Sequence, residues 1–279
     1  MSGPRPRTRR TARNPRRSPP GARTADRGAG GDQVEGRQAV AELLAAGRRQ
    51  VIDVWLTDDA EQRSAPVVDR ITELASTRGV PIRRVNGARL AAEARTEAPQ
   101  GVLAHARPLP ETDFDDLCQP GAGAGTPFLL ALDGVTDPQN LGALLRTAEG
   151  AGVTGVVLPR HRAAHVTATV TKAAAGAVEH VPITVVSGLP AALARAGDLG
   201  LWVVGLDPGA DQSLFDLTLA DQGVVVVLGA EGRGLSRLVR QRCDLMLSIP
   251  LRGRLGSLNV AAAGALALFE ISRRRPAGG

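Results

Sequence analysis

The hydrophobic pattern changes near residue 128, where amphipathic segments give way to short, almost continuously apolar runs. Before that point, apolar residues recur at helical spacing over residues 66–78, and the run VIDVWL at 51–56 reads as a strand. After it, runs such as VVVVLG (224–229) alternate with helical segments. Strands covered by helices on both faces are apolar along their whole length. The alternation therefore predicts an α/β fold with a parallel sheet in residues 128–279.

The same pattern predicts the individual elements. We expect strands over residues 51–56, 80–85, 101–104, 128–133, 153–159, 181–186, 201–206, 224–229 and 245–250. We expect helices between Gly36 and Gly47, after Gly234, and over residues 66–78, 87–94, 138–151, 166–177, 189–196 and 257–274. In parallel sheets, ligands bind beyond the carboxyl ends of the strands, where glycine-rich turns lead into helices.

Proline and glycine divide the chain into segments. Residues 106–127 contain four prolines and the run GAGAG, a composition typical of a linker. This run is no dinucleotide-binding motif, because no strand precedes it and no helix follows it directly. The predicted division is therefore a disordered tail (1–33), a small α/β domain (34–105), the linker, and a larger α/β domain (128–279).

The positive charge is concentrated in the predicted tail. Residues 1–33 contain nine arginines and two aspartates, a net charge of +7, whereas the rest of the chain has a net charge of −1. After Met1 the tail has no hydrophobic residue larger than alanine, so it cannot pack a core and is expected to be disordered. A basic arm favours a polyanionic partner such as nucleic acid; a merely solvated tail is the alternative.

Composition excludes several classes of protein. Aromatic residues make up 2% of the chain, which argues against modules that stack RNA bases on aromatic side chains. The only lysine, Lys172, is not in a P-loop motif. Cys118 and Cys243 have no further Cys or His at metal-ligand spacing, which predicts neither a disulfide framework nor a metal site and fits a reducing cytoplasm. We find no signal peptide and no apolar run long enough to span a membrane.

The segment LDGVTDPQNLGALLRTAEGAG (132–152) contains the first candidate functional residues. Asp137 is placed to cap a helix whose first turn contains Pro138. Asn140 and Arg146 lie off the apolar stripe and about 120° apart at ~100° per residue. They can serve one site only if that site borders the helix from two sides. On spacing alone, a capping asparagine and a solvated arginine are the favoured interpretation.

Two later segments combine small residues with isolated polar ones. The strand at 224–229 ends in Gly229, and glycines there allow tight turns and a close approach to a ligand. Glu231 could order an arginine or meet a ligand hydroxyl, or could simply be an exposed acid near a helix N-terminus. Ser257 is the predicted N-cap of the last helix, with Asn259 in its first turn. The following alanines and glycine permit close packing, although an ordinary buried helix would also explain them.

Three motifs in these segments resemble those of the SPOUT-class RNA ribose 2′-O-methyltransferases of the SpoU type. They are GVTDPQNLGALLRTAEGAG, GAEGRGLS and SIPLRGRLGSLNVAAA, in the family's order. Upstream, VEGRQAVAELL and QGVLA resemble the L30e/L7Ae-like RNA-binding domain of the branch that methylates a guanosine of 23S rRNA. The resemblance implies a sheet with a deep trefoil knot, S-adenosylmethionine as cofactor, RNA as partner, no metal, and a cytoplasmic homodimer.

The resemblance also implies roles for individual residues. It places the cofactor against Gly229, Ile249 and Leu258, and it makes Asn140, Arg146, Glu231, Ser257 and Asn259 the polar catalytic set. We interpret Arg146 as the residue that activates the ribose 2′-hydroxyl. Because the pKa of arginine is above 12, a phosphate oriented by Arg146 is favoured over Arg146 itself as the proton acceptor. Asn140 would orient Arg146 or the ribose, Glu231 would fix the geometry, and the other two would shape the pocket.

Three alternatives stay open at this point. The same chemistry could act on tRNA or on another rRNA nucleotide, as in a self-resistance methyltransferase. A non-catalytic RNA-binding protein could use the same fold, although the intact motif around Asn140 and Arg146 argues against it. A nicotinamide-dependent dehydrogenase is disfavoured, because no Gly-x-Gly-x-x-Gly follows a predicted strand.

Overall fold

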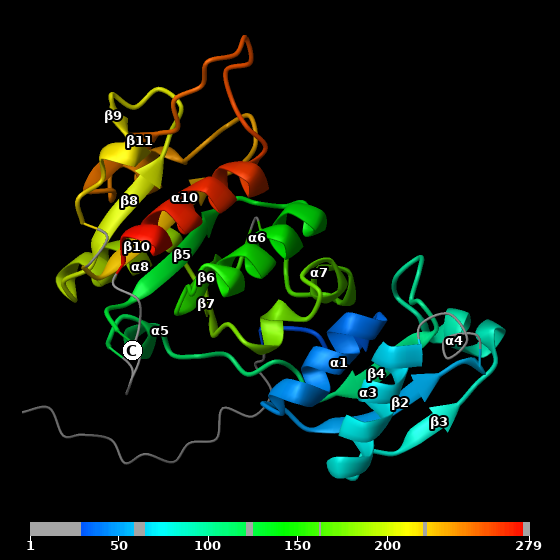
Figure 1. Ribbon diagram of the computed structural model, residues 1–279. Helices are drawn as coiled ribbons and strands as arrows, with labels where there is room; N and C mark the ends of the chain where they lie inside the picture. The colour runs from blue at the N-terminus through cyan, green and yellow to red at the C-terminus, as the bar shows by residue number, and fades with distance from the viewer. Residues whose placement is uncertain (1–28, 59–64, 121–124, 162, 220–221, 276–279) are drawn as a thin grey trace, which may run out of the picture.

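The computed structural model describes residues 29–58, 65–120, 125–161, 163–219 and 222–275. These residues form two units, each built around its own β-sheet (Figure 1). The predicted α/β fold with a parallel sheet is confirmed.

The N-terminal unit is a four-stranded mixed sheet in the order β1-β4-β2-β3. Its elements are β1 (Gln33–Glu35), α1 (Arg37–Ala46), β2 (Val51–Leu56), α3 (Ala65–Thr77), β3 (Ile82–Arg84), α4 (Gly87–Glu93) and β4 (Val102–Ala106). β4 pairs antiparallel with β1 and β2, and β2 pairs parallel with β3. Helices α1 and α3 bury one face around Leu43, Val54 and Ile71, and α4 covers Trp55 on the other face.

The C-terminal unit is a seven-stranded sheet in the order β7-β6-β5-β10-β8-β11-β9, and all of its strand pairs are parallel. Its strands are β5 (Phe128–Asp133), β6 (Gly155–Pro159), β7 (Ile183–Val186), β8 (Trp202–Leu206), β9 (Gln212–Ser213), β10 (Val224–Gly229) and β11 (Leu245–Ser248). Its helices are α5 (Phe114–Leu117), α6 (Pro138–Gly150), α7 (Ala168–Ala173), η1 (Ala177–Glu179), α8 (Leu189–Asp198), η2 (Leu214–Asp216), α9 (Arg237–Arg240) and α10 (Val260–Arg274).

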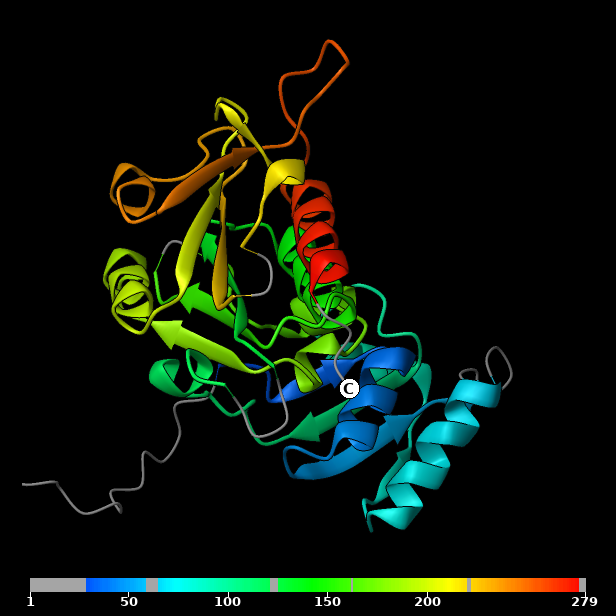
Figure 2. The same ribbon diagram turned by 60° about the vertical axis from the view of Figure 1, so that its left-hand side comes forward.

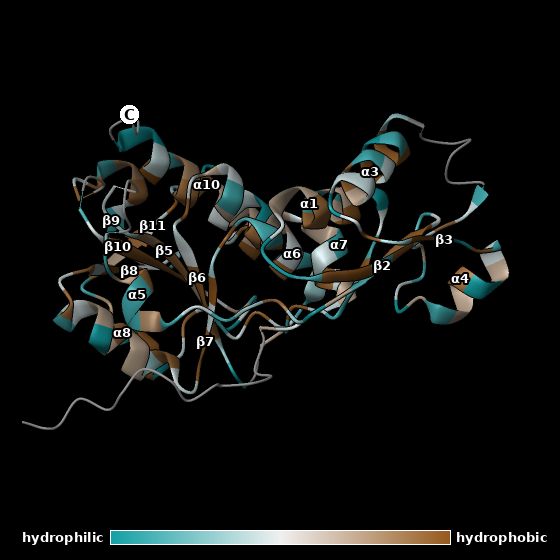
Figure 3. Ribbon diagram, turned by 90° about the horizontal axis from the view of Figure 1, so that it is seen from below, coloured by the Kyte–Doolittle hydropathy of each residue, from teal (hydrophilic) through white to brown (hydrophobic). Residues whose placement is uncertain are grey.

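Helices cover both faces of this sheet, which explains its apolar strands. Leu130 and Val226 point into a core closed by α6, α7 and α10. Their neighbours Leu129 and Val225 point into a second core closed by α5, α8 and α9. Figure 2 shows the two helical layers with the sheet between them, and Figure 3 shows the hydrophobic strands enclosed by helices of mixed polarity. Successive strand residues therefore serve opposite cores.

A buried ion pair joins the two units. The Arg49 guanidinium contacts both carboxylate oxygens of Glu179, and the two side chains are 3% and 0% exposed. Arg49 also donates to the carbonyl oxygens of Gly31 and, at 3.0 Å, Arg107. Close by, a Cβ on Gly176 would lie 2.6 Å from Glu42 Cβ, so the units touch there without a side chain between them. These contacts fix how the N-terminal unit is oriented on the C-terminal one.

The structure corrects the predicted tail and the predicted linker. The prediction of disorder through residue 33 is wrong for residues 29–33: Ala29 N donates to Leu109 O at 2.8 Å, and β1 begins at Gln33. Residues 1–28 lie outside the described residues. The predicted linker contains the helix α5, capped by Asp113, and its Leu117 belongs to a core of the C-terminal unit.

Candidate active site

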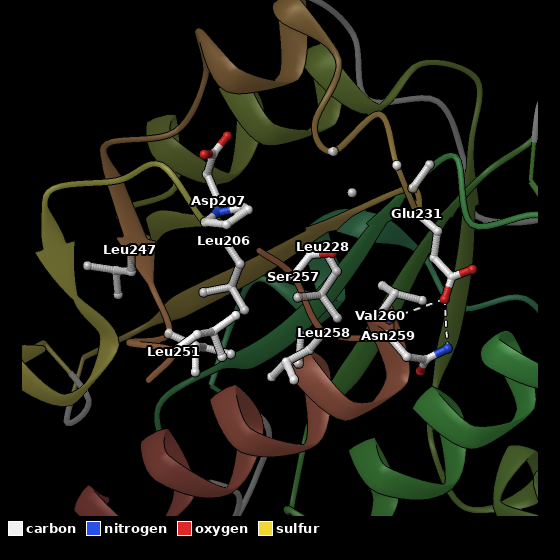
Figure 4. Close-up of a pocket in the computed structure, with 17 residues that line it drawn as sticks. Leu206, Asp207, Leu228, Glu231, Leu247, Leu251, Ser257, Leu258, Asn259 and Val260 are labelled. Carbon is white, nitrogen blue, oxygen red and sulfur yellow. Dashed lines mark hydrogen bonds between the residues drawn. The ribbon is translucent and has the colours of Figure 1, made fainter. Parts of the chain in front are cut away.

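A cavity of about 360 Å³ lies at the carboxyl edge of the parallel sheet (Figure 4). Three strands reach it with their carboxyl ends, and the amino end of α10 closes it. The lining residues are Leu206–Pro208 after β8, Leu228–Gly232 and Gly234 after β10, Leu247, Ile249 and Leu251 around the end of β11, and Ser257–Val260 with Ala263. Parallel sheets bind their ligands at this edge.

Glycine is required where β10 ends. A Cβ on Gly229 would lie 2.2 Å from the Gly234 carbonyl carbon and 2.4 Å from the Leu235 nitrogen. The backbone folds back there, with Ala230 and Gly234 exchanging hydrogen bonds of 2.8 and 3.2 Å. Gly232 and Gly234 have φ angles of +75° and +64°, a region that L side chains rarely adopt. The result is a backbone cradle along one wall of the cavity.

Asn259 is the centre of the polar contacts at the site. Its Nδ2 donates to Glu231 Oε1 at 2.6 Å and to Asn140 Oδ1 at 3.0 Å. Its Oδ1 accepts from the backbone nitrogens of Ala261 and Ala262, which makes Asn259 the N-cap of α10. Figure 4 shows Glu231 and Asn259 directed toward one another. One side chain thus joins three segments that are far apart in the sequence.

The structure brings together four of the five predicted catalytic residues. Glu231, Ser257 and Asn259 line the cavity. Asn140 is joined to this group by its hydrogen bond with Asn259. Asp137 caps α6, accepting from Gln139 N and Asn140 N, so the asparagine side chain is free to face the site instead of capping the helix. The three predicted cofactor contacts, Gly229, Ile249 and Leu258, also line the cavity.

The structure corrects the predicted helix cap at Ser257 and places Arg146 away from the cavity. The prediction that Ser257 is the N-cap of the last helix is wrong, because α10 begins at Val260 and Asn259 caps it. Arg146 does not line the cavity; it is exposed on α6, with no hydrogen bond or ion pair to the residues that the structure describes. Six residues at 1.5 Å per residue place it about 9 Å along the helix from Asn140. The 120° offset expected from the sequence therefore separates the two side chains.

Some lining residues were missed in the sequence. Leu206 ends the predicted strand at 201–206 and Asp207 follows it, so strand-end position alone could have identified them. Asp207 accepts from Gly209 N at 2.8 Å and pairs with Arg240, so it is held at the rim.

The cavity suits a nucleoside-sized ligand. Its walls combine leucine and isoleucine side chains with the backbone of three strand ends, and its volume lies within the usual range for small-molecule sites. The glycine at 229 lets the loop to Gly234 fold back on itself, so that backbone from Gly229 to Gly232 and Gly234 lines the cavity. Among the described residues, no group of three potential ligands could hold a metal ion, and no helix is long and apolar enough to cross a membrane.

Comparisons with known proteins found matches to both units of the chain. Residues 127–269 match the model of the SpoU rRNA Methylase family, and residues 33–112 match the RNA 2′-O ribose methyltransferase substrate-binding model. The chain is 41% identical over 247 residues to the 23S rRNA (guanosine-2′-O-)-methyltransferase RlmB of Pseudomonas aeruginosa, covering 88% of this chain and 97% of that one. It is 40% identical over 259 residues to an uncharacterized tRNA/rRNA methyltransferase of Mycobacterium avium, covering 92% and 82%.

A solved structure shows the same fold. The AdoMet-bound rRNA methyltransferase of Sinorhizobium meliloti superimposes with a TM-score of 0.68 at 26% identity, covering 86% of each chain. The match extends over both units, so it includes the N-terminal sheet as well as the cavity-bearing one.

Proposed function

The chain belongs to the SpoU rRNA methylase family, and from this premise we propose that it methylates the ribose 2′-hydroxyl of a guanosine in 23S rRNA, with S-adenosylmethionine as the methyl donor. The observation that carries the proposal is the cavity at the ends of β8, β10 and β11, joined through Asn259 to Glu231 and Asn140. The relatives named for 23S rRNA support the choice of substrate.

Gly229, Ile249 and Leu258 would hold the cofactor. Gly229 offers bare backbone, and the other two offer apolar side chains. When bound, S-adenosylmethionine supplies an electrophilic methyl group that reacts by in-line displacement. Asn259 and Glu231 fix the amino end of α10 against the cavity, and Ser257 shapes its entrance, so the site is set before RNA arrives.

Arg146 would act on the substrate rather than on the cofactor. Its guanidinium stays protonated at neutral pH and presents a fork that matches a phosphate. It orients an RNA phosphate, which takes the proton from the 2′-hydroxyl as the methyl group is transferred. Arg146 is exposed on α6 and does not line the cavity of its own protomer. A second surface must therefore bring the RNA to it.

A second copy of the chain would supply that surface, so we propose a homodimer. Leu266 and Phe269 of α10 are 44% and 52% exposed, and Phe269 lies beside Gly150 at the end of α6. Large exposed apolar side chains on one face of a helix are typical of an interaction surface. Pairing through this face would bring Arg146 of one protomer near the cavity of the other. A monomer in sedimentation at micromolar concentration would contradict this arrangement.

The knot, the L30e-like fold of the N-terminal unit, the domain boundaries and the cytoplasmic location are also part of the proposal. The deep trefoil knot would be formed by the segment from β10 to α10, and α10 packs against α6 and β10. The N-terminal unit would be L30e-like and would bind RNA, and residues 34–105 and 128–279 would be the two domains. A cytoplasmic location follows from the rRNA substrate.

The test is direct. Calorimetry should show that the protein alone binds S-adenosylmethionine and S-adenosylhomocysteine, because the Gly229 cradle forms without RNA. Mass spectrometry of ribose-methylated nucleotides in rRNA and tRNA from a deletion strain should show the loss of one 2′-O-methylguanosine from 23S rRNA. Loss of a nucleotide from tRNA would reassign the substrate, and binding of a nicotinamide dinucleotide alone would overturn the proposal.

A further inference from the structure

A second, larger cavity lies between the two units. It has a volume of about 740 Å³ and is bounded by α1, the loop after α4, the amino end of α6, and α7. Gln139 of α6 lines it and precedes Asn140 in the chain, so the first turn of α6 contributes one residue to this interdomain cleft and one to the candidate active site. The loop before β4 and α7 form two sides of the cleft, and Lys172 of α7 contacts the Ala98 carbonyl oxygen of that loop.

The cleft is polar, and much of its hydrogen-bonding capacity is unused. The side chains of Gln38, Glu97, Gln139 and Thr169 line it and make no hydrogen bond to the described part of the chain. The apolar residues that line it are alanines. Carboxamides and a hydroxyl both donate and accept, and the Glu97 carboxylate accepts. This mixture suits the edge of an RNA base better than an apolar ligand or a bare anion.

Lys172 brings a positive charge to the same cleft. Its Nζ donates to the carbonyl oxygen of Ala98 across the interface, and it forms no ion pair with a carboxylate of the described residues. A Cβ on Gly36 would lie 3.5 Å from Lys172 Cγ and 3.3 Å from Gln100 Oε1, so both side chains pass over that glycine. The charge therefore stays available to a phosphate at the edge of the cleft.

The cleft is preformed. The buried Glu35 carboxylate accepts from the backbone nitrogens of Arg95 and Thr96 at 2.6 and 3.1 Å, which holds the loop that forms one wall. The Arg49–Glu179 pair joins the two units, so it fixes the opposite wall of the cleft relative to this loop. Ordering costs on binding are small when the binding surface is already in place.

We propose that this cleft binds an unpaired RNA nucleotide adjacent to the methylated one, with Gln139 contacting its base and Lys172 its phosphate. The inference rests on the proposed function and extends it to how the RNA is selected. An RNA held in this cleft would contact both units while its neighbouring nucleotide lies at the catalytic cavity. Gln139 and Lys172 would be specificity and affinity determinants, not catalytic residues.

The first test measures RNA affinity against salt, using an unmodified 23S rRNA transcript as the probe. Lys172→Gln should lower the log–log salt slope by roughly 0.7, the contribution of one phosphate contact on single-stranded RNA. A purely structural role of Lys172 would weaken binding without changing the slope. Arg242→Gln is the matched control: it removes the same charge from an exposed position before β11, at the far side of the sheet from α7, and should leave the slope unchanged.

The second test uses Gln139→Ala, which removes an exposed side chain that makes no hydrogen bond to the described residues, and the variant should fold normally. Its affinity for the transcript should fall roughly tenfold, and its preference for the base beside the target should relax, whereas S-adenosylmethionine affinity should not change. The loss in kcat/KM should lie mainly in KM for RNA.

Wild-type methylation of the same transcript separates the two proposals. If the wild type methylates RNA and both variants bind it with wild-type affinity, salt slope and base preference, the cleft inference is overturned and the proposed function stands. If the wild type methylates no RNA, the proposed function fails. The salt slopes then still decide whether the cleft binds RNA.

Discussion

Asn259 donates a hydrogen bond of 2.6 Å to the Glu231 carboxylate while it caps α10 with its other side-chain atom. Asn259 is therefore both the N-cap of α10 and part of the candidate active site. Any change at Asn259 should affect both stability and catalysis, and the two effects can be separated by the choice of substitution.

Asn259→Ala should lower the free energy of unfolding by about 1 kcal/mol, the usual cost of losing an N-cap. It should also lower methyl transfer by roughly 100-fold, since only the longer contact of 3.4 Å from Val260 N then ties the amino end of α10 to Glu231. Chemical denaturation and turnover measured on one preparation check both values.

Asn259→Asp is the informative comparison. It keeps the capping oxygen but replaces the amide that donates to Glu231 with a second carboxylate. Methyl transfer should fall at least as far as in Asn259→Ala, because two carboxylates repel each other where the wild type has a hydrogen bond. Turnover near that of the wild type would contradict the geometry around Glu231.

Arg146→Ala should reduce methyl transfer by about 100-fold or more and leave S-adenosylmethionine binding intact. Because Arg146 is exposed and has no partner among the described residues, the free energy of unfolding should change by less than about 0.5 kcal/mol. Arg146→Lys should retain part of the activity, since lysine still attracts a phosphate without the bidentate fork. Near-normal turnover of Arg146→Ala would eliminate the assigned role.

Breaking the buried ion pair should be far more costly. Glu179→Leu leaves the Arg49 guanidinium buried without its carboxylate and should lower the free energy of unfolding by about 3–5 kcal/mol. The double variant Arg49→Met/Glu179→Leu should be more stable than the sum of the single changes predicts. Asp115→Asn, which breaks the exposed pair with Arg195, is the control and should cost far less, because solvent screens exposed ion pairs. Equal losses for the two pairs would mean that burial is unimportant here.

The strands and several helix ends could be predicted from the sequence because their causes are local. The runs at 51–56 and 128–133 coincide with β2 and β5, since a continuous apolar stretch between turn residues leaves few alternatives. Asp137 was identified as a cap by its position before Pro138. The three glycine-rich and polar motifs were found as short segments, and they converge on one cavity because parallel strands end on the same edge.

Other features depend on contacts that a local pattern does not contain. Ser257 and Asn259 are both good N-cap residues, and the Glu231 carboxylate, 28 residues earlier, holds the amide of Asn259 where α10 starts. The Arg49–Glu179 pair joins residues 130 positions apart, and charged residues are normally expected at the surface. The helix α5 is one turn long and lies in a segment whose composition is that of a linker.

The two cysteine thiols should be unreactive in the folded protein. Burial raises the pKa of Cys118 to about 12 and that of Cys243 to about 11. At pH 8 the thiolate fraction of Cys118 would be on the order of one in ten thousand, and the thiolate is the reactive form. Labelling with a thiol reagent should be slow in buffer and rapid in denaturant. Labelling of the native protein at the rate of a free cysteine would show that these sites open readily.

The basic N-terminal segment can be separated from the catalytic fold by truncation. Because residues 29–33 pack against the structure, the deletion should cover residues 1–28, which removes nine arginines and one aspartate. If about four of these arginines reach phosphates, the log–log salt slope of RNA binding should fall by roughly three units, at ~0.7 per contact. Affinity at low salt should drop, whereas the methylated nucleotide should stay the same, because phosphate contacts position RNA without reading its sequence. S-adenosylmethionine binding, which depends on the cavity around Gly229, should be unaffected.

RNA binding against salt, with the methylated position mapped for both proteins, distinguishes the outcomes. An unchanged slope would make the segment a solvated appendage, and a shifted methylation site would mean that it reads RNA structure.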